Sequence, residues 1–430
     1  MKAAFFTLGC KVNQYETQIL TQQFAQEGFS VVDAREAADV YVVNSCTVTS
    51  TGDKKTRQVL RRFRRANPGA VIALTGCYPQ AFPEEASGIL EADVVTGSRN
   101  RGALLGAIRR FQDTGERVVD ILPHERGEAF EPMRAQSFLE RTRAFVKIED
   151  GCDRYCSYCI IPYARGPVRS KAPEQIRQEL EELAHQGYQE IVLVGINLPS
   201  YGRDMGLRLI DAVKAACSVP GVRRLRLGSL EPELLTGEDL AVMASLPQFC
   251  PQFHLCLQSG CDRTLRAMNR HYDTAEYRRI AADIRAAFPN PSITTDIIVG
   301  FPGETEEDFE ASRAFAKEMG FARAHVFSFS PREGTRAARM EGQVSPQVKE
   351  ARSAAMIAAA DGTRRAFLLS QVGRVEEVLF ETNRTPYGIE GYTRNYTPVC
   401  VDTSREVCGT LRKVRITAAL GECCVGELAD

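Results

Sequence analysis

Six cysteines constrain this chain more than any other feature. Three of them form a C-x3-C-x2-C run: Cys152, Cys156 and Cys159. Three others each follow a short apolar stretch near the N-terminus: Cys10, Cys46 and Cys77. Three thiolates can hold three irons of a [4Fe–4S] cluster and leave the fourth iron open to a ligand. The two sets therefore predict two open clusters, and a fold that brings the scattered set together.

The overall composition sets broad limits on the function. With 44% hydrophobic and 25% charged residues, the chain is an ordinary globular protein. Its net charge of −1 gives no general attraction to nucleic acid, so any such contact must come from a local patch. No run of about 18 apolar residues occurs, which predicts no membrane contact. Fourteen cysteines without an export signal favour a reducing cytoplasm and metal binding over disulfides.

Residues 1–125 alternate between short apolar runs and helical patterns, which predicts a parallel sheet with helical crossovers. The expected strands are 3–8, 40–44, 71–75 and 92–95, and the expected helices include 16–27 and 54–66. In such sheets, ligands bind beyond the carboxyl ends of the strands. The three N-terminal cysteines follow successive strand ends, so we expect them to form one site.

The rest of the chain divides into a linker and two further domains. The linker covers 122–137, and strands are expected at 143–148, 190–194, 224–227, 253–257, 292–299 and 324–329. Six strands with intervening helices suit a partial (β/α)6 barrel and are too few for a closed barrel of eight units. Short runs rich in Val, Thr, Tyr and Gly predict a small antiparallel β-barrel at the end. The predicted class is α/β, with domains at 1–125, 138–365 and 368–430.

The C-x3-C-x2-C run resembles the signature of the radical S-adenosylmethionine (SAM) superfamily. Zinc modules instead pair two cysteines with a second, distant pair. Three ligands leave one iron free to chelate the amino and carboxylate groups of SAM, whose reductive cleavage yields a 5′-deoxyadenosyl radical. The resemblance implies that Tyr158, just before the last cysteine, lies against the adenine. Accidental spacing is the alternative.

Two other strand ends are candidates for the wall of a SAM site. Gly300 and Gly303 lie between a predicted strand and a predicted helix, and glycine lets the backbone approach a ligand closely. Taken alone, this segment favours an ordinary turn; beside the cysteine run it favours a cofactor wall. Gly195 and Asn197, after another predicted strand, are a weaker candidate of the same kind.

Several segments together resemble the radical SAM methylthiotransferase family, in the family's order along nearly the whole chain. They are residues 7–16, 43–49, 75–80, 152–169, 257–262 and 268–270. The resemblance implies a cysteine domain, a radical SAM domain and an RNA-binding barrel of the TRAM type. The unusual Pro167 affects local loop shape and no predicted ligand.

Within that family, Lys11-Val12-Asn13 and Gly260-Cys261-Asp262 are similar to one branch. This branch acts on N6-threonylcarbamoyladenosine at position 37 of tRNA. The alternative substrates are isopentenyladenosine 37 and a ribosomal protein side chain. A more distant alternative is that the chain is an iron–sulfur RNA-binding protein without enzymatic activity.

The resemblance also implies a mechanism with two SAM molecules. One donates a methyl group to a sulfur on the N-terminal cluster. The other is cleaved at the second cluster, and the resulting radical abstracts hydrogen from C2 of the adenine, where a methylthio group is inserted. The implied partners are the anticodon stem-loop of tRNA, an electron donor such as flavodoxin or ferredoxin, and a sulfur source.

One predicted helix concentrates positive charge, with no acid after Asp53. Its basic residues are Lys54, Lys55, Arg57, Arg61, Arg62, Arg64 and Arg65. Because solvated helices normally mix both signs, this pattern predicts contact with RNA phosphates, and an ordinary solvated helix is the alternative. In the last domain, Tyr387, Tyr392 and Tyr396 either stack on bases or belong to the barrel core.

Overall fold

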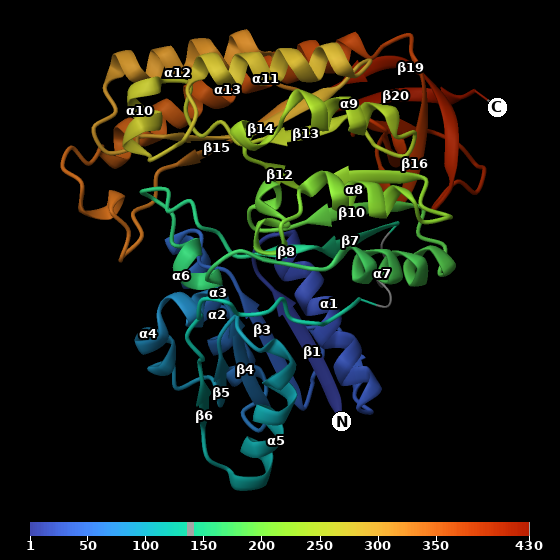
Figure 1. Cartoon of the computed structure of the whole chain (residues 1–430). Coiled ribbons are helices and arrows are strands. Elements are labelled where there is room, and N and C mark those ends of the chain that lie inside the picture. The colour runs from blue at the N-terminus through green and yellow to red at the C-terminus, as the bar shows by residue number, and fades with distance from the viewer. Residues whose placement is uncertain (136–141, 430) are drawn as a thin grey trace.

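The computed structural model describes residues 1–135 and 142–429, which form three parts in chain order. In Figure 1 the first part, in blue, lies below the second, in green to orange, and the red C-terminal barrel lies at one side of the second. The described part of the predicted linker, 122–135, contains no helix or strand. Residues 136–141, and with them the predicted start of the second domain, lie outside the described residues, so the exact domain limits stay a prediction. None of the described helices combines the length and the hydropathy needed to cross a membrane.

The first part is a parallel sheet in the order β2-β1-β3-β4-β5-β6. Its strands are β1 (Lys2–Thr7), β2 (Ser30–Val32), β3 (Val40–Ser45), β4 (Val71–Gly76), β5 (Val94–Thr96) and β6 (Val118–Asp120). Helices α1 (Lys11–Gln26) and α5 (Leu104–Thr114) pack on one face, and α2 (Ser50–Ala66), α3 (Cys77–Ala81) and α4 (Pro83–Ser87) pack on the other. β3 and β4 are buried along their whole length, as expected for strands covered on both faces. The four predicted strands are confirmed.

The second part is an arc of parallel strands covered by helices. Its strands are β7 (Arg143–Lys147), β10 (Glu190–Val194), β11 (Arg224–Leu227), β12 (Ser229–Leu230), β13 (Gln252–Leu255), β14 (Ser292–Val299) and β15 (Arg323–Ser328). The longer helices are α7 (Pro173–His185), α8 (Leu209–Cys217), α9 (Gly237–Ser245), α11 (Thr274–Ala287), α12 (Glu306–Met319) and α13 (Pro346–Ser370). Short elements are β8 (Glu149–Asp150), β9 (Arg169–Ser170), α6 (Ile161–Arg165) and α10 (Asp262–Ala267).

The six predicted strand positions of this arc are confirmed, with one difference. At Gly228 the third strand breaks into β11 and β12, so the arc consists of two sheets, β11-β10-β7 and β12-β13-β14-β15. The arc leaves β7 and β15 as open edges, and α1 of the first part packs along β7. The open side of the partial barrel therefore faces the cysteine domain.

The last part is a closed barrel in the order β16-β17-β18-β20-β19. Its strands are β16 (Val375–Thr385), β17 (Gly388–Thr393), β18 (Pro398–Val401), β19 (Leu411–Leu420) and β20 (Cys423–Leu428). The small barrel is confirmed, although β18 and β20 pair in parallel while the other pairs are antiparallel. β20, which closes the barrel, lies beyond 409–418, the last strand that the sequence predicts.

Buried arginines attach this barrel to the arc. Arg224 donates to the Tyr392 carbonyl at 3.0 Å, and Arg226 donates to the Thr393 carbonyl at 2.7 Å. Between them lies the carboxylate of Glu190, which is fully buried. Burial alone would raise the pKa of Glu190, but Arg226 and Arg143 hold it at about 2. The barrel is thus docked through charged groups that have no access to water.

Candidate active site

The structure brings the loops of Cys10, Cys46 and Cys77 together, because β1, β3 and β4 are neighbours in the sheet and each cysteine lies just beyond one of them. A Cβ at Gly9 (φ +116°) would lie 2.7 Å from Cys46 Cβ, so only glycine lets the first loop pass the second. Gly76 (φ +101°) is needed for the same reason, because a Cβ there would lie 2.5 Å from the carbonyl oxygen of Ser45.

The three thiols also act on one another electrostatically. Burial raises the pKa of Cys77 to about 12, with Arg165 opposing and Cys46 and Cys10 adding to the rise. Burial likewise raises the pKa of Cys46, and Cys10 contributes to that rise. Within residues 1–135 and 142–429, no three His, Cys, Asp or Glu side chains are grouped around a single metal ion. The ligands of a cluster bind different irons and lie further apart than the ligands of a single ion, so three thiols on neighbouring loops at one sheet edge fit an iron–sulfur cluster.

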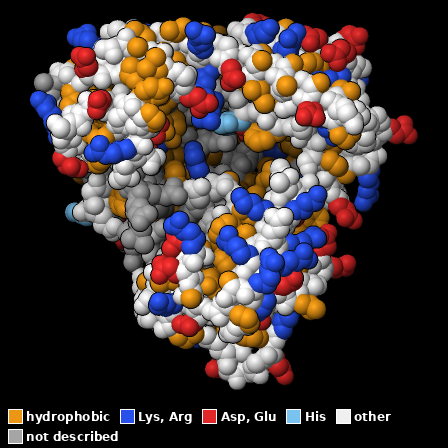
Figure 2. Space-filling view, turned by 180° about the vertical axis from the view of Figure 1, so that it is seen from behind, with side chains coloured by type: hydrophobic (Ala, Val, Ile, Leu, Met, Phe, Trp, Pro, Cys, Tyr) orange, Lys and Arg blue, Asp and Glu red, His pale blue; other side chains and the backbone are white. Residues whose placement is uncertain are grey.

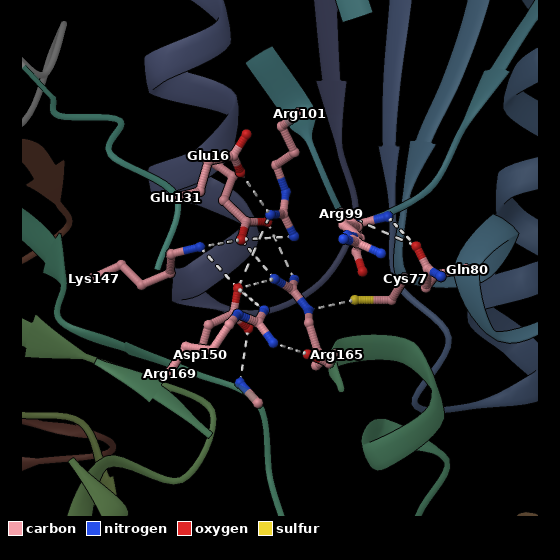
Figure 3. A network of polar contacts seen from close by, with 12 residues as sticks. Glu16, Cys77, Gln80, Arg99, Arg101, Glu131, Lys147, Asp150, Arg165 and Arg169 are labelled. Carbon is pink, nitrogen blue, oxygen red and sulfur yellow. Dashed lines mark hydrogen bonds and ion pairs between the residues drawn. The ribbon is translucent and has the colours of Figure 1, made fainter. Parts of the chain in front are cut away.

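A buried network centred on Arg165 joins the cysteine domain to the arc (Figure 3). Arg165 Nε donates to Cys77 Sγ at 3.1 Å, and Nη1 donates to Glu16 Oε1 at 2.5 Å. Lys147 Nζ bridges Glu16 at 2.9 Å and Asp150 at 3.0 Å. Burial opposes ionisation of Glu16, but Arg101 and Arg165 lower its pKa to about 2. The network therefore couples a predicted cluster ligand directly to the domain interface.

The Cys152 run lies in the loop between β8 and α6. Burial raises the pKa of Cys159 to about 12, and the neighbouring Cys156 adds to the rise. Arg270 Nη1 lies 3.3 Å from Cys156 Sγ and 3.4 Å from the hydroxyl oxygen of Tyr158. The Tyr158 ring packs edge-on against Phe301 with 6.4 Å between centroids. Tyr158 and the segment holding Gly300 and Gly303 thus lie side by side.

Gly195 and Asn197 lie against a buried acid that precedes this run. Asn197 N donates to Glu149 Oε2 at 2.8 Å, and a Cβ at Gly195 would lie 2.5 Å from the same oxygen. Burial raises the pKa of Glu149 well above its usual range. Glu149 Oε1 and Asn197 Oδ1 are buried with no hydrogen-bond partner among the described residues. Unpaired polar atoms beside the cysteine loop fit a polar ligand such as SAM.

The two glycines after β14 have different surroundings. Gly300 has a φ of +70°, which favours glycine, and a Cβ there would lie 2.4 Å from Lys349 Cγ on α13. A Cβ at Gly303 would meet open space. Contact of either glycine with SAM stays a prediction.

A cavity of about 940 Å³ lies where the three parts meet. Figure 2 shows this face of the molecule hollowed between its upper and lower halves. The lining includes residues from every part: Cys10, Lys11, Gly195, His254, Asp296, His325 and Tyr387. Within the lining, His254 Nε2 lies 3.4 Å from Asp296 Oδ2. Cavities of this size hold ligands as large as a nucleoside.

Tyr387, Tyr392 and Tyr396 do not belong to the apolar core of the barrel, and stacking on bases stays a prediction. Tyr392 and Tyr396 stack on each other with 4.5 Å between centroids, and the Arg143 guanidinium lies 4.9 and 5.0 Å from the two rings. These two rings form part of the domain interface and of the cavity wall. Tyr387 is exposed at the cavity and keeps a ring face available for stacking.

The basic helix predicted to bind RNA is α2, and its side chains gather with other Lys and Arg in the lower half of Figure 2. Three of its arginines pair with acids from other segments. Arg57 contacts Glu85 at 2.6 Å, Arg61 contacts Glu91 at 3.0 Å and Arg64 contacts Asp93 at 2.6 Å. The four remaining basic residues are exposed and form no ion pair within the described part of the chain: Lys54, Lys55, Arg62 and Arg65.

Two candidate functional residues, Arg165 and Arg270, were not predicted individually from the sequence. Arg165 contacts Cys77 and Glu16, which are 88 and 149 positions away, and Arg270 contacts Cys156, 114 positions away. Both lie inside segments that carry the family resemblance, which was the available signal. No spacing rule links them to the cysteines, because they are brought together by tertiary packing.

Comparison with known proteins decides the family. Residues 146–316 match the Radical SAM superfamily, and residues 2–97 match the Uncharacterized protein family UPF0004. The chain is 38% identical over 424 residues to "Threonylcarbamoyladenosine tRNA methylthiotransferase MtaB" of Bacillus subtilis, with 97% of this chain and 94% of that protein covered. The chain belongs to the radical SAM tRNA methylthiotransferases.

Other methylthiotransferases match over similar lengths. The protein of the same name from Aquifex aeolicus is 35% identical, with 97% and 100% coverage. A "tRNA-2-methylthio-N(6)-dimethylallyladenosine synthase" of Clostridium botulinum is 34% identical, with 99% and 95% coverage. These matches confirm the predicted family, its resemblance to the threonylcarbamoyladenosine branch and the enzyme class. For a radical SAM methylthiotransferase, SAM and a [4Fe–4S] cluster follow from the family.

A solved structure shares the fold. The radical SAM methyltransferase TsrM from Kitasatospora setae superimposes with a TM-score of 0.56 at 16% identity, over 78% of this chain and 77% of that one. At this identity the likeness concerns the fold alone. It confirms that the partial barrel of this methylthiotransferase has the arrangement of radical SAM enzymes.

Proposed function

We propose that this enzyme inserts a methylthio group at C2 of N6-threonylcarbamoyladenosine 37 in tRNA, using two [4Fe–4S] clusters and two SAM molecules. The observation that carries the proposal is the shared cavity. Its lining includes Cys10 of one cysteine set and Gly195, which packs on Glu149 just before the other set. One nucleoside in this cavity would lie within reach of both sites.

In this proposal, Cys10, Cys46 and Cys77 hold one cluster, and Cys152, Cys156 and Cys159 hold the other. When bound, the two clusters and SAM supply a sulfur carrier and a radical, which an aryl C–H bond needs because it has no acidity for a general base. Arg165 fixes Cys77 by a hydrogen bond, and Arg270 does the same for Cys156. Tyr158 packs between Arg270 and Phe301, where it can support an adenine ring.

The choice of substrate rests on the relatives. Four matched proteins at 32–38% identity carry threonylcarbamoyladenosine in their names, and four at 31–34% carry dimethylallyladenosine. Lys11-Val12-Asn13 after the first cysteine also supports the former. We further propose that the enzyme works in the cytoplasm on the anticodon stem-loop, with a flavodoxin or ferredoxin as electron donor and a separate sulfur source.

The substrate is tested by nucleoside mass spectrometry of tRNA from cells that lack this protein. The 2-methylthio form of N6-threonylcarbamoyladenosine should disappear and its unmethylthiolated precursor should accumulate, while methylthio-isopentenyladenosine stays unchanged. Plasmid-borne wild type should restore the product, and Cys152→Ala should not. Loss of methylthio-isopentenyladenosine instead, or unchanged levels of both nucleosides, would refute the assignment.

The charges on α2 make a second, separate prediction about RNA binding. Replacing Lys54 and Lys55 by glutamine should weaken binding of the anticodon stem-loop and flatten the slope of log Kd against log salt by about one unit for each lost contact. These two side chains are exposed and unpaired, so their charge is available to phosphate. Arg61→Gln is the matched control, because that arginine already pairs with Glu91. Equal slopes for the double variant and the control would contradict phosphate contact at Lys54 and Lys55.

A further inference from the structure

Lys11 is a cation in the cavity lining without an acidic partner. It is the first residue of α1, directly after Cys10, and its side chain lines the cavity. Its Nζ lies 5.9 Å from the centroid of the Phe145 ring. No carboxylate of residues 1–135 or 142–429 comes within 4.0 Å of it. A charge held against an aromatic ring beside an open cavity is available to a ligand.

The surroundings of Lys11 carry an excess of positive charge. Arg143, Arg226, Cys10 and Glu190 all lie within electrostatic reach of Lys11. Glu190 is the shared partner of three arginines, at 3.3 Å from Arg143, 3.4 Å from Arg224 and 2.8 Å from Arg226. Further acids in this group come from the barrel, where Glu377 pairs with Arg224 and Glu381 pairs with Arg143. Arg223 also pairs with Glu377, so Lys11 adds a fifth cation to a group of four arginines and three carboxylates.

The acids in the cavity lining do not offset this charge at Lys11. Asp296 faces His254, and Glu422 faces Arg364 at 3.1 Å. Glu390 lies on β17 of the barrel and is not among the groups that act on Lys11 most strongly. An anionic ligand group would therefore complete the charge balance at this end of the cavity. A contact between a lysine ammonium and a carboxylate is charge-assisted and therefore stronger than a hydrogen bond between neutral groups.

We propose that Lys11 binds the carboxylate of the threonylcarbamoyl group and thereby selects nucleosides with an anionic N6 substituent. This inference rests on the proposed function, since it concerns the same cavity and the same substrate. A neutral alkyl substituent such as isopentenyl would leave Lys11 unpaired, and a site built to pair a ligand group rejects ligands that lack it. Because Lys11 directly follows Cys10, an anchor there holds the nucleoside near the first cysteine set.

The test compares binding of two anticodon stem-loop RNAs to the cluster-loaded enzyme by fluorescence anisotropy. One carries N6-threonylcarbamoyladenosine, and the other carries its methyl ester, which lacks the charge. Wild type should bind the acid about tenfold more tightly than the ester, as expected for a hydrogen bond to a charged group. Lys11→Met should bind both RNAs equally, and Lys11→Arg should retain the preference. Lys214→Met, on the exposed side of α8, is the matched lysine control and should behave as wild type.

Iron content and circular dichroism establish that each variant is folded and loaded before binding is measured. Equal binding of acid and ester by wild type would overturn the proposal, and so would a preference that survives in Lys11→Met. Methylthio product from the acid RNA is measured in parallel with wild type. If wild type forms product but binds the acid and ester RNAs equally, only the proposed role of Lys11 is refuted. If wild type forms no product from the acid RNA, the result counts against the proposed function itself.

Discussion

Replacing Cys10, Cys46 and Cys77 together by alanine is expected to halve the iron content, from about eight to about four irons per chain. The variant should still form 5′-deoxyadenosine from SAM under reducing conditions, because the Cys152 run lies in a separate loop beyond β8. It should form no methylthio product, since the site proposed to carry the sulfur is gone. Iron and sulfide analysis, together with chromatography of the nucleosides, measures all three quantities.

Two controls sharpen this experiment. Alanine at Cys152, Cys156 and Cys159 should abolish both 5′-deoxyadenosine and product. Cys217→Ala, at a buried cysteine of α8, should leave the iron content unchanged. About four irons in the wild-type protein would rule out two clusters, and product from the first triple variant would rule out a sulfur-carrying role for the N-terminal set.

Replacing Arg165 by methionine is expected to lower the free energy of unfolding by about 3 kcal/mol or more. The guanidinium has no solvent exposure and contacts Cys77, Glu16 and Asp150 at once. Its removal leaves two buried carboxylates with fewer cationic partners, although Lys147 and Arg101 still contact Glu16. Urea unfolding followed by circular dichroism, with wild type and variant equally loaded with iron, measures the difference.

The matched control is Arg35→Met, which removes an ion pair of similar length on the surface. Arg35 lies 2.8 Å from Asp33, but its side chain is 88% exposed. Exposed pairs contribute little because water and salt screen them, so this variant should unfold like wild type. A loss in Arg165→Met no larger than that in Arg35→Met would mean that the buried network does not hold the two domains together.

Local signals allowed many elements to be predicted. The strands at 190–194, 224–227 and 292–299 match β10, β11 and β14. α12 also shows a local signal, since Thr305 and Asp308 form a capping box in which the hydroxyl and the carboxylate satisfy backbone amides at the start of the helix. The break between β11 and β12 at Gly228 and the closing strand β20 were not predicted, since pairing partners far along the chain decide both.

The basic helix shows the limit of such signals. Because no acid follows Asp53 in this helix, the sequence favoured seven basic side chains free to bind phosphate. In the structure, Glu85, Glu91 and Asp93 from later segments pair with three of these side chains. In the same way, Tyr392 and Tyr396, for which base stacking was one prediction, stack on each other at the domain interface. Charge and ring contacts between segments far apart in the chain depend on the packed structure and leave no periodic trace in the sequence.

The sequence by itself determined the chemistry of this protein. The spacing of Cys152, Cys156 and Cys159 is a local property, because ligands within one loop are close in any fold, and it indicates a radical-generating cluster. The order of strands along residues 1–125 also predicted that Cys10, Cys46 and Cys77 meet at one sheet edge. Only the tertiary structure joined Arg165 to Cys77 and placed Lys11 in a cavity beside a group of arginines. These arrangements join residues that are far apart in the chain, and long-range packing decides them.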